Sequence, residues 1–489
     1  MSEHPEPAEE LPPDGDAPYV ARFSGRKRPH AWSPLLVGGW HAVLESGPTG
    51  RLTVVVPEVR AVRRLAADGS ADVLAAGRWT QLPGRGAAAF LDALRSDVPP
   101  APQGWPRFRT GWILALGYEL GCDFEPVRPA PDDLGLPRAV LFEAADTLTF
   151  DARTGDLFVA LRPRGDLERM RSEDLTDLRG RAAALVARWD AACEAPPPVL
   201  RPAGDPAPVL AESLGAGAFA RAARRAQELI AAGDTYQVNL STRLELPAAA
   251  DPLLAYEAVR ATNPSPYMSF LRGPEFTLVC GSPELLVEAA GGVIASRPIA
   301  GTRPRTGLAD EDAAFARELA ADSKERAEHL MLVDLLRNDV GRVAAPGTVR
   351  VPEFMAVERY SHVMHLVSQV EGALPSPRPA PAAVIRALFP GGTVTGAPKV
   401  RTMQVIAELE PVARGFYTGS VGWADDSGDL CLNIVIRTLV QTRPFRGPPR
   451  CFVQAGAGVV ADSVPGREHE ESLRKALALR VALARALTA

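Results

Sequence analysis

The stretch Thr235-Tyr-Gln-Val-Asn-Leu-Ser-Thr-Arg-Leu-Glu-Leu246 alternates along much of its length between polar and apolar side chains, which predicts a β-strand. Directly before it, residues 216–232 have the apolar spacing of an amphipathic helix that ends at Gly233. One face of the strand is polar and carries Gln237, Asn239 and Ser241. The other face carries Tyr236, Val238 and Leu240. We expect the second face to pack on a core, and the polar face to lie either in solvent or in a ligand cavity.

Upstream of this helix lies a proline-rich segment that neither continues a helix nor completes a strand ladder at its prolines. Before that segment, strands are predicted at Leu52–Val56, Gly111–Tyr118 and Ala139–Phe142, and a helix at Leu175–Ala192. The 489 residues exceed what one core usually serves. We therefore predict a disordered, acidic and proline-rich tail (1–17), an N-terminal domain (18–194), a linker (195–212) and a catalytic domain (213–489).

Composition excludes several classes of function. The net charge is -5, with 46% hydrophobic and 23% charged residues, so no basic field is available to hold nucleic acid. No apolar run approaches the length of a membrane span, and the N-terminus lacks the pattern of a secretory signal. The five cysteines are scattered, without metal-ligand spacing. We expect a cytoplasmic protein with reduced thiols and without zinc, nucleic-acid or membrane partners.

Two predicted helices each carry a pair of glutamates three residues apart, which places both carboxylates of a pair on one helical face. The pairs are Glu325/Glu328 and Glu468/Glu471. Carboxylates without convergent His or Cys suit a hard cation such as Mg²⁺. Each pair also has a structural explanation, because Glu325 fits a capping box with Asp322 and Glu471 fits an ion pair with Lys475.

The segment Gly391-Gly-Thr-Val-Thr-Gly-Ala-Pro-Lys399 resembles a phosphate-binding loop only superficially. Ala397-Pro398 stands where that loop needs Lys followed by Ser or Thr. What remains is a Gly/Thr loop that leads to Pro398 at the first position of a helix. The free N–H groups there either bind a substrate carboxylate or only begin an ordinary helix.

Arg437 is predicted to lie in an apolar strand, Leu432–Val440, where a buried guanidinium requires a partner such as a carboxylated ligand. Downstream, Gly456 and Gly458 let the backbone approach a ligand closely.

These segments, taken in order, resemble the chorismate-utilising family, which includes the component I subunits of anthranilate synthase and aminodeoxychorismate synthase. The similarity runs from about Gly233 to Ala476. The N-terminal half matches more loosely, through Leu44-Glu45-Ser46 and residues 117–121. The segments that carry the main resemblance are 233–241, Asn263–Met268, Gly281–Glu284, Arg297–Thr302, Lys324–His329, Ser361–His365, Thr393–Lys399 and Ile436–Thr438.

The resemblance implies an α/β (α+β) fold of antiparallel sheets surrounded by helices, preceded by an N-terminal layer of the component I type. It implies chorismate as substrate and Mg²⁺ held by Glu328 and Glu471 with help from Glu325 and Glu468. Glu284 would be the general acid for the departing C4 hydroxyl, which needs a pKa raised by burial. The other implied catalytic residues are His365, Gln237 and Thr302. The implied substrate-binding residues are Ala300, Gly301, Thr393, Tyr417, Arg437, Gly456, Gly458 and Lys475.

The resemblance also places Gln237 at the position where family members that add water to chorismate have a lysine, which acts as the base. Ammonia is therefore the expected nucleophile, supplied by a separate glutamine amidotransferase subunit or from solution, since no cysteine sits in a glutaminase-like turn. An alanine at position 300 resembles the anthranilate synthases. Four other segments resemble the aminodeoxychorismate synthases instead: Gln237–Ser241, Tyr417–Trp423, Asn433–Thr438 and residues 117–121. We expect an aminodeoxychorismate synthase, with anthranilate synthase as the alternative and a non-catalytic binding subunit as a remote one.

A second pocket is also implied. Ser46, Pro266, Tyr267 and Met268 resemble the tryptophan pocket of feedback-inhibited anthranilate synthases. These residues form either an inhibitor pocket or a purely structural part of the fold.

Overall fold

Two antiparallel β-layers are joined through the long strands β4 (Leu52–Leu65) and β8 (Ala139–Asp151). In this computed structural model, β4 and β8 pair from Leu52↔Asp151 to Leu65↔Ala139, with register shifts between Val55 and Ala61. The first half of β4 pairs with β3 and the second half with β5, so each half belongs to a different layer. The structure describes residues 5–14, 16–36, 38–46, 51–163, 175–202, 204–359, 363–443 and 447–487.

The first layer contains strands from both halves of the chain. Across the layer these strands are β1 (Glu9–Leu11), β2 (Tyr19–Phe23), β9 (Asp156–Leu161), β8, β4, β3 (His41–Glu45), β12 (Tyr267–Arg272), β13 (Phe276–Ser282), β22 (Thr438–Thr442), β23 (Arg450–Val459) and β11 (Gln237–Leu246). The short strands β10 (Ala211–Glu212) and β19 (Gly396–Ala397) pair with the other side of β11.

The second layer is built in the same mixed way. Its strands are β6 (Arg78–Gln81), β5 (Ala71–Ala75), β4, β8, β7 (Gly111–Leu116), β20 (Ser420–Asp425), β21 (Leu430–Asn433), β14 (Leu285–Ala290), β15 (Val293–Ser296), β18 (Val363–Ala373), β16 (Ile299–Pro304) and β17 (Arg350–Arg359). Because β3 pairs with β12 and β7 pairs with β20, the segments 18–194 and 213–489 share both layers.

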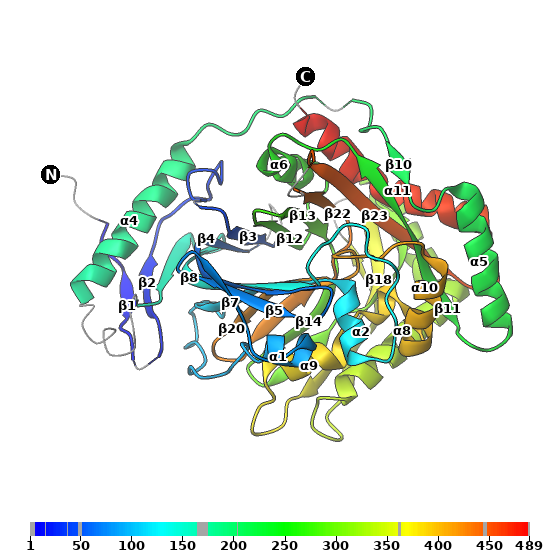
Figure 1. Cartoon of the computed structure of the whole chain (residues 1–489), viewed down its shortest axis with the longest axis horizontal. Coiled ribbons are helices and arrows are strands. Elements are labelled where there is room, and N and C mark those ends of the chain that lie inside the picture. The colour runs from blue at the N-terminus through cyan, green and yellow to red at the C-terminus, as the bar shows by residue number, and fades with distance from the viewer. Residues whose placement is uncertain are drawn as a thin grey trace.

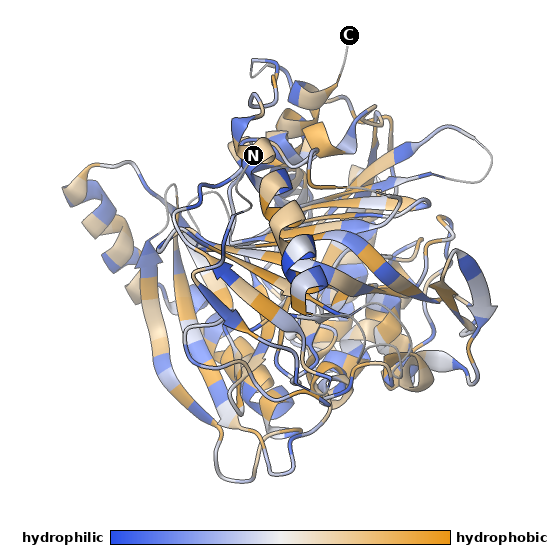
Figure 2. Cartoon of the chain, turned by 90° about the vertical axis from the view of Figure 1, so that its left-hand side faces the viewer, coloured by the Kyte–Doolittle hydropathy of each residue, from blue (hydrophilic) through white to orange (hydrophobic). Residues whose placement is uncertain are grey.

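The layers pack on each other through an apolar core, and β7 shows how the sequence serves both of its faces. Ile113 and Ala115 belong to the cluster that also contains Phe276 and Phe416, whereas Trp112, Leu114 and Leu116 belong to a second cluster under helices. A strand buried on both faces reads as a continuous apolar run, as β7 does. Figure 2 shows the alternation of hydrophobic and hydrophilic residues that marks other strands.

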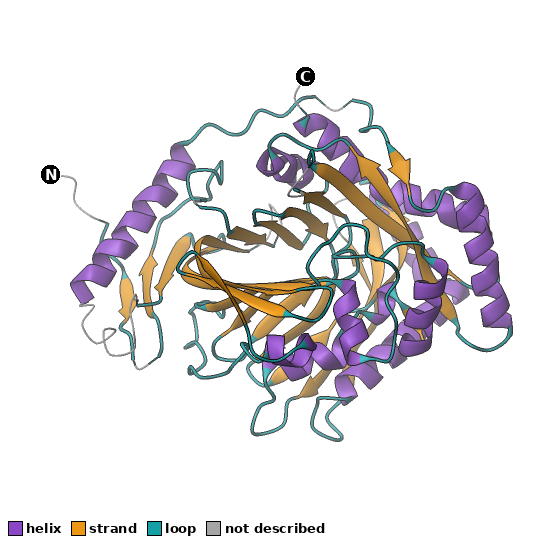
Figure 3. Ribbon diagram, in the orientation of Figure 1, coloured by secondary structure: helices purple, strands orange, loops and turns teal. Residues whose placement is uncertain are grey.

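Helices cover the outer faces of both layers (Figures 1 and 3). The first layer is covered by α4 (Leu175–Glu194), α6 (Pro252–Thr262), α11 (Pro465–Ala486), α5 (Ala216–Ala231) and α10 (Lys399–Leu409). The second is covered mainly by α1 (Gly86–Leu91), α9 (Pro381–Leu388) and α8 (Ser323–Gly341), with α7 (Ala309–Ala321) beside β16 and β17. The short helices are η1 (Tyr118–Leu120), α2 (Gly121–Phe124) and η2 (Gly392–Val394).

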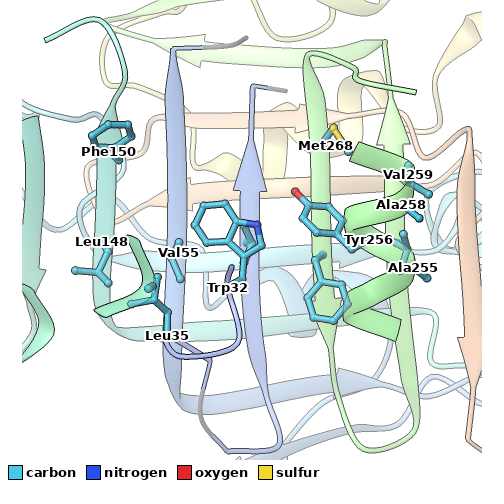
Figure 4. Packing of buried hydrophobic residues seen from close by; sticks show 14 of the residues in the cluster. Trp32, Leu35, Val55, Leu148, Phe150, Ala255, Tyr256, Ala258, Val259 and Met268 are labelled. Atoms are coloured by element: carbon cyan, nitrogen blue, oxygen red, sulfur yellow. The ribbon is translucent and has the colours of Figure 1, made fainter. Parts of the chain in front are cut away.

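The largest buried cluster joins the N-terminal and C-terminal segments beneath α4, α6 and α11. Figure 4 shows Trp32, Val55 and Tyr256 packed over neighbouring strands of the first layer. Trp32 and Tyr256 are almost completely buried, so this contact stabilises the seam between the two segments.

The predicted fold class is confirmed, as are the strands within β4, β7 and β8 and the helices α4 and α5. The tail expected to be disordered contains β1, because Glu10 accepts hydrogen bonds from Tyr19 (2.6 Å) and Arg179 and thereby ties the segment to β2 and α4. Residues 1–4 and 15 of that tail, and 361–362 of the sequence segment Ser361–His365, lie outside the described residues.

The predicted linker has no helix or strand over its described residues before β10. It runs along α11, where Arg201 and Ala207 donate backbone hydrogen bonds to the carbonyls of Arg485 and Arg480. Among the described residues, no helix has the length and apolarity needed to cross a membrane.

Candidate active site

A cavity of about 700 Å³ lies between β11 and β23 of the first layer and β16 and β18 of the second. Helices α8 and α11 contribute further lining residues. The cavity gathers every catalytic, substrate-binding and metal-binding candidate: Gln237, Glu284, Ala300, Gly301, Thr302, Glu325, Glu328, His365, Thr393, Tyr417, Arg437, Gly456, Gly458, Glu468, Glu471 and Lys475. Residues far apart in sequence therefore form one site.

The polar face of β11 lies partly in this cavity. Gln237 and Asn239 line it, whereas the Ser241 hydroxyl donates a hydrogen bond to buried Glu410 (2.7 Å). On the other face, Val238 and Leu240 are fully buried as expected. Tyr236 is 70% exposed, because β11 begins one residue later and Tyr236 lies outside the paired strand. The cavity interpretation of the polar face is thus correct for two of its three side chains.

Gly456 and Gly458 of β23 make room for these two polar side chains. A Cβ atom at Gly456 would lie 2.6 Å from Asn239 Oδ1, and one at Gly458 would lie 2.3 Å from Gln237 Nε2. Atoms do not approach this closely, so a larger residue at either position would collide with the polar side chain of the adjacent strand β11. The Gly456 carbonyl also accepts a hydrogen bond from Lys475 Nζ (3.0 Å).

Glu284 is the carboxyl group best suited to carry a proton at neutral pH. It follows β13, is 8% exposed, and accepts a hydrogen bond from the Thr393 hydroxyl (2.6 Å). Burial raises its pKa from 4.5 to about 7, against the opposing effects of Thr393, Lys475 and Arg437. A buried acid with this pKa is protonated in a large fraction of molecules at pH 7 and is suited to general acid catalysis.

His365 and Thr302 face each other across β18 and β16. Thr302 Oγ1 lies 3.0 Å from His365 Nδ1, and the Gly301 carbonyl oxygen lies 3.2 Å from the same nitrogen. Because the carbonyl can only accept, this arrangement favours the tautomer with the proton on Nδ1. Burial is the main cause that lowers the pKa of His365, so the neutral ring is favoured.

Gly301 lies at an irregularity in the β16–β18 pairing and adopts a positive φ of 68°. A Cβ atom at this position would lie 2.8 Å from Leu319 Cδ1 and 3.0 Å from Glu325 Oε2. Both the backbone conformation and the available space therefore require glycine. The irregularity brings β16 close to the carboxylates of α8.

The four glutamates line the cavity from two helices, α8 and α11. Glu325 Oε1 lies 3.5 Å from Arg303 Nη1. The pKa of Glu325 is raised, mainly by burial and to a smaller extent by repulsion from the Glu328 carboxylate. Glu328 accepts a hydrogen bond from Gln237 (2.9 Å), and Glu471 pairs with Lys475 (2.9 Å). In the part of the chain that the structure describes, no three His, Cys, Asp or Glu side chains are gathered closely enough to hold a metal ion.

Of the two structural alternatives for these pairs, the ion pair is present and the capping box is only half formed, because the Asp322 N–H donates to the Glu318 carbonyl (2.9 Å) and not to the Glu325 carboxylate. Asp322 is the N-cap of α8 and accepts hydrogen bonds from the backbone of Lys324 and Glu325, while Lys475 forms the i,i+4 pair with Glu471. Neither interaction removes the glutamates from the cavity wall. Lys324 and Arg474 also line the cavity and were not predicted, although both lie on the predicted helices beside the glutamate pairs.

The strand predicted over Leu432–Val440 is wrong at its centre. β21 ends at Asn433, β22 begins at Thr438, and Arg437 lies between them with a positive φ of 50°. This unusual backbone conformation turns the chain at the cavity wall, where the guanidinium and Glu284 interact electrostatically. Burial disfavours the charged form of Arg437 and lowers its pKa, so an anionic ligand in the cavity would offset the cost of burying this charge.

The Gly/Thr loop also differs from its prediction. Helix α10 begins at Lys399, with Pro398 as an exposed cap, and Lys399 is buried against Asp339 (2.6 Å) and the Leu388 carbonyl (3.0 Å). The ordinary helix start is therefore the correct interpretation, since Pro398 and Lys399 do not line the cavity. Thr393 is the side chain that this loop brings to the site.

A second cavity of about 450 Å³ is lined by all four residues of the predicted inhibitor pocket: Ser46, Pro266, Tyr267 and Met268. Glu45 also lines it. Its carboxylate accepts hydrogen bonds from the Arg28 guanidinium and the Tyr256 hydroxyl, and its Oε2 lies 3.4 Å from Arg260 Nε. The cavity is present; whether an inhibitor binds there stays a prediction.

A family model described as chorismate binding enzyme matches residues 42–480. The chain belongs to the family of chorismate-binding enzymes. It is 44% identical over 384 residues to aminodeoxychorismate synthase component 1 of Bacillus subtilis (strain 168), covering 78% of each chain. It is also 44% identical over 413 residues to anthranilate synthase component 1 of Streptomyces coelicolor, covering 81% of this chain and 78% of that protein.

A solved structure agrees with this membership. Anthranilate synthase component I from Streptococcus pneumoniae TIGR4 matches with a TM-score of 0.73 and 30% sequence identity, over 88% of this chain and 92% of that chain. The recognised family is thus confirmed by sequence and by fold. Relatives that make different products are equally similar to this chain at 44% identity, so similarity alone does not distinguish their two reactions.

Proposed function

We propose that this chain is the component I subunit of an aminodeoxychorismate synthase. It would convert chorismate and ammonia to 4-amino-4-deoxychorismate and water, with ammonia delivered by a glutamine amidotransferase partner. The observation that carries the proposal is Glu284, an acid with a pKa of about 7 beside Arg437 and Lys475 in a cavity large enough for a small dicarboxylate.

In this proposal, the cationic side chains bind substrate and the acidic side chain of Glu284 transfers a proton. Arg437 and Lys475 bind a substrate carboxylate, and Tyr417 lies on the same cavity wall. Glu284 donates its proton to the C4 hydroxyl, which leaves as water. Ammonia forms the new bond to C4, and the proton it then loses can return to Glu284, so the acid is restored after each turnover.

Mg²⁺ is the cofactor of the proposal, held by Glu328 and Glu471 with Glu325 and Glu468 beside them. When bound, the ion would neutralise the carboxylate on the chorismate ring. The chemistry of the donors fits a hard cation, because repulsion from Glu328 contributes to the raised pKa of Glu325. Glu328 and Glu471 would exchange their contacts with Gln237 and Lys475 for the ion.

Gln237 and Ala300 support amination. Gln237 donates to Glu328 and has no basic side chain that could activate water, while Ala300 offers no nucleophile at the cavity wall. Ala300 also favours the second candidate, an anthranilate synthase component I that adds ammonia at C2 and then eliminates pyruvate. The segments Gln237–Ser241 and Tyr417–Trp423 favour the first candidate by their resemblance to aminodeoxychorismate synthases.

The test uses purified protein with chorismate, Mg²⁺ and ammonium. We expect chorismate to be consumed and 4-aminobenzoate to form only after an aminodeoxychorismate lyase is added. Direct anthranilate fluorescence would establish the second candidate instead. Failure of the parent protein to consume chorismate, with Glu328→Gln indistinguishable from it, would overturn both.

A further inference from the structure

The guanidinium of Arg414 is buried beside the active site and uses all five of its N–H donors. Nε and Nη2 bind the two carboxylate oxygens of Glu410 at 2.9 and 2.7 Å. Nη1 donates to the Val394 carbonyl (3.0 Å) and Thr418 Oγ1 (3.1 Å), and Nη2 also donates to the Asn239 carbonyl (2.7 Å). Arg414 is 3% exposed and does not line the cavity, so it does not contact a ligand there.

The acceptors of Arg414 belong to three separate segments of the cavity wall. Val394 follows Thr393, which binds Glu284, and Thr418 follows Tyr417. Asn239 itself lines the cavity from β11. The Tyr417 ring also lies 5.6 Å from the guanidinium, within cation–π distance. One side chain therefore fixes the relative positions of three groups that face the substrate.

Glu410 completes this link. Its Oε1 accepts hydrogen bonds from the backbone N–H of Ser241 (2.9 Å) and the Ser241 hydroxyl (2.7 Å) as well as from Arg414. The carboxylate is 4% exposed, so its charge is matched within the protein. The pair thus attaches α10, where Glu410 ends the helix, to the centre of β11.

The N-terminal half of the chain holds the same loop from the other side. Both carboxyl oxygens of Glu119 accept backbone hydrogen bonds, from Arg414 (2.7 Å) and Gly415 (3.0 Å). The Tyr118 ring lies 4.7 Å from the Arg414 guanidinium. Residues 414–418 therefore have little freedom to adopt another conformation.

We propose that Arg414, paired with Glu410 and supported by Glu119, is a positioning residue that sets Tyr417, Thr393 and Asn239 in the geometry that binds substrate. The inference rests on the proposed function in that chorismate is the substrate, and it does not depend on which product forms. Lysine could keep the charge but has three donors and no planar fork, so it could not bridge all of these acceptors.

The test is a double-mutant cycle on kcat/KM for chorismate with Arg414→Lys and Tyr417→Phe. Each single variant should lose at least tenfold. Because Arg414 acts partly through Tyr417, the double variant should lose less than threefold more than the worse single variant. Glu410→Gln provides a second route, and in combination with Tyr417→Phe it should show the same non-additivity even where Arg414→Lys fails to fold.

Arg109→Lys is the matched control. Arg109 is 5% exposed and lies 3.7 Å from Asp425, yet it lines no part of the active-site cavity. Its substitution should lower thermal stability and change kcat/KM by less than twofold. Hydrogen exchange should rise in residues 411–419 for Arg414→Lys and stay unchanged there for Arg109→Lys.

Two outcomes separate this inference from the proposed function. A parent enzyme that consumes no chorismate overturns the proposed function, and the inference with it. If the parent turns over chorismate but the losses of the single variants multiply, or if Arg414→Lys behaves like Arg109→Lys, the inference alone is wrong.

Discussion

Glu284→Gln should greatly lower kcat and, at alkaline pH, stabilise the protein. Burial raises the pKa of Glu284 from 4.5 to about 7, which means that ionising it in the folded protein is unfavourable. Each unit of pKa corresponds to 1.36 kcal/mol, so the parent loses about 3 kcal/mol of stability as the carboxyl group ionises. Glutamine has a similar shape and cannot ionise, so the variant avoids this loss.

The sign follows from the direction of the shift. A carboxyl group whose folded pKa is raised contributes stability that is fully present below its unfolded value, near 4.5, and is lost as the pH rises through about 7. The free energy of unfolding of Glu284→Gln minus that of the parent should therefore increase by about 3 kcal/mol between pH 4.5 and pH 8.5. Over the same interval, turnover by the parent should fall as the acid form of Glu284 is lost.

Urea denaturation of both proteins at a series of pH values measures the difference directly. Burial also raises the pKa values of Glu119 and Glu257 to about 7. Their contribution to the pH dependence of stability is the same in the parent and the variant, so it cancels in the difference. Loss of a general acid should lower kcat by about 10² to 10⁴-fold. A difference in unfolding free energy that is the same at pH 5 and pH 8.5 would refute the assignment of a raised pKa to Glu284.

Three further changes test other parts of the structure. Lys399→Met leaves the Asp339 carboxylate buried without its partner and should cost about 3–5 kcal/mol in urea denaturation, most of which Asp339→Leu should restore in the double variant. Gly458→Ala places a Cβ atom 2.3 Å from Gln237 Nε2, so KM for chorismate should rise while the helical circular dichroism signal stays unchanged. Glu328→Gln should raise the Mg²⁺ concentration needed for half-maximal turnover at least tenfold, and an unchanged requirement would argue against Glu328 as a ligand.

The sequence predicted the fold class correctly, and the candidate residues that it singled out line one cavity. The apolar run of β7 and the helical spacing of the two glutamate pairs depend on neighbours along the chain, which a sequence displays directly. The polar alternation in β11 correctly placed Gln237 and Asn239 together. It could not show that Ser241 turns to Glu410, which lies 169 residues further along the chain.

The incorrect predictions arose where long-range contacts decide local structure. The N–H groups at the start of the helix after Pro398 were one candidate for a substrate carboxylate, but Lys399 at that helix start is buried, and its ammonium group donates a hydrogen bond to Asp339 of α8. Arg437 looked like a strand residue because its neighbours are apolar, yet β21 ends at Asn433, and Arg437 has a positive φ directly before β22 begins. Neither partner nor dihedral angle can be read from the local pattern, since both are set by the packing of distant elements.

The same long-range contacts explain how the N-terminal half influences the candidate active site, although none of its described residues lines the cavity. β7 pairs with β20 and β3 pairs with β12, so the first half of the chain covers edges that the second half would otherwise expose. Glu119 lies a few residues after β7, and its carboxyl group accepts hydrogen bonds from the backbone N–H groups of Arg414 and Gly415. The geometry at Tyr417 thus depends on a strand pairing and a carboxylate supplied by a segment almost 300 residues earlier, which gives the N-terminal layer a direct part in shaping the site.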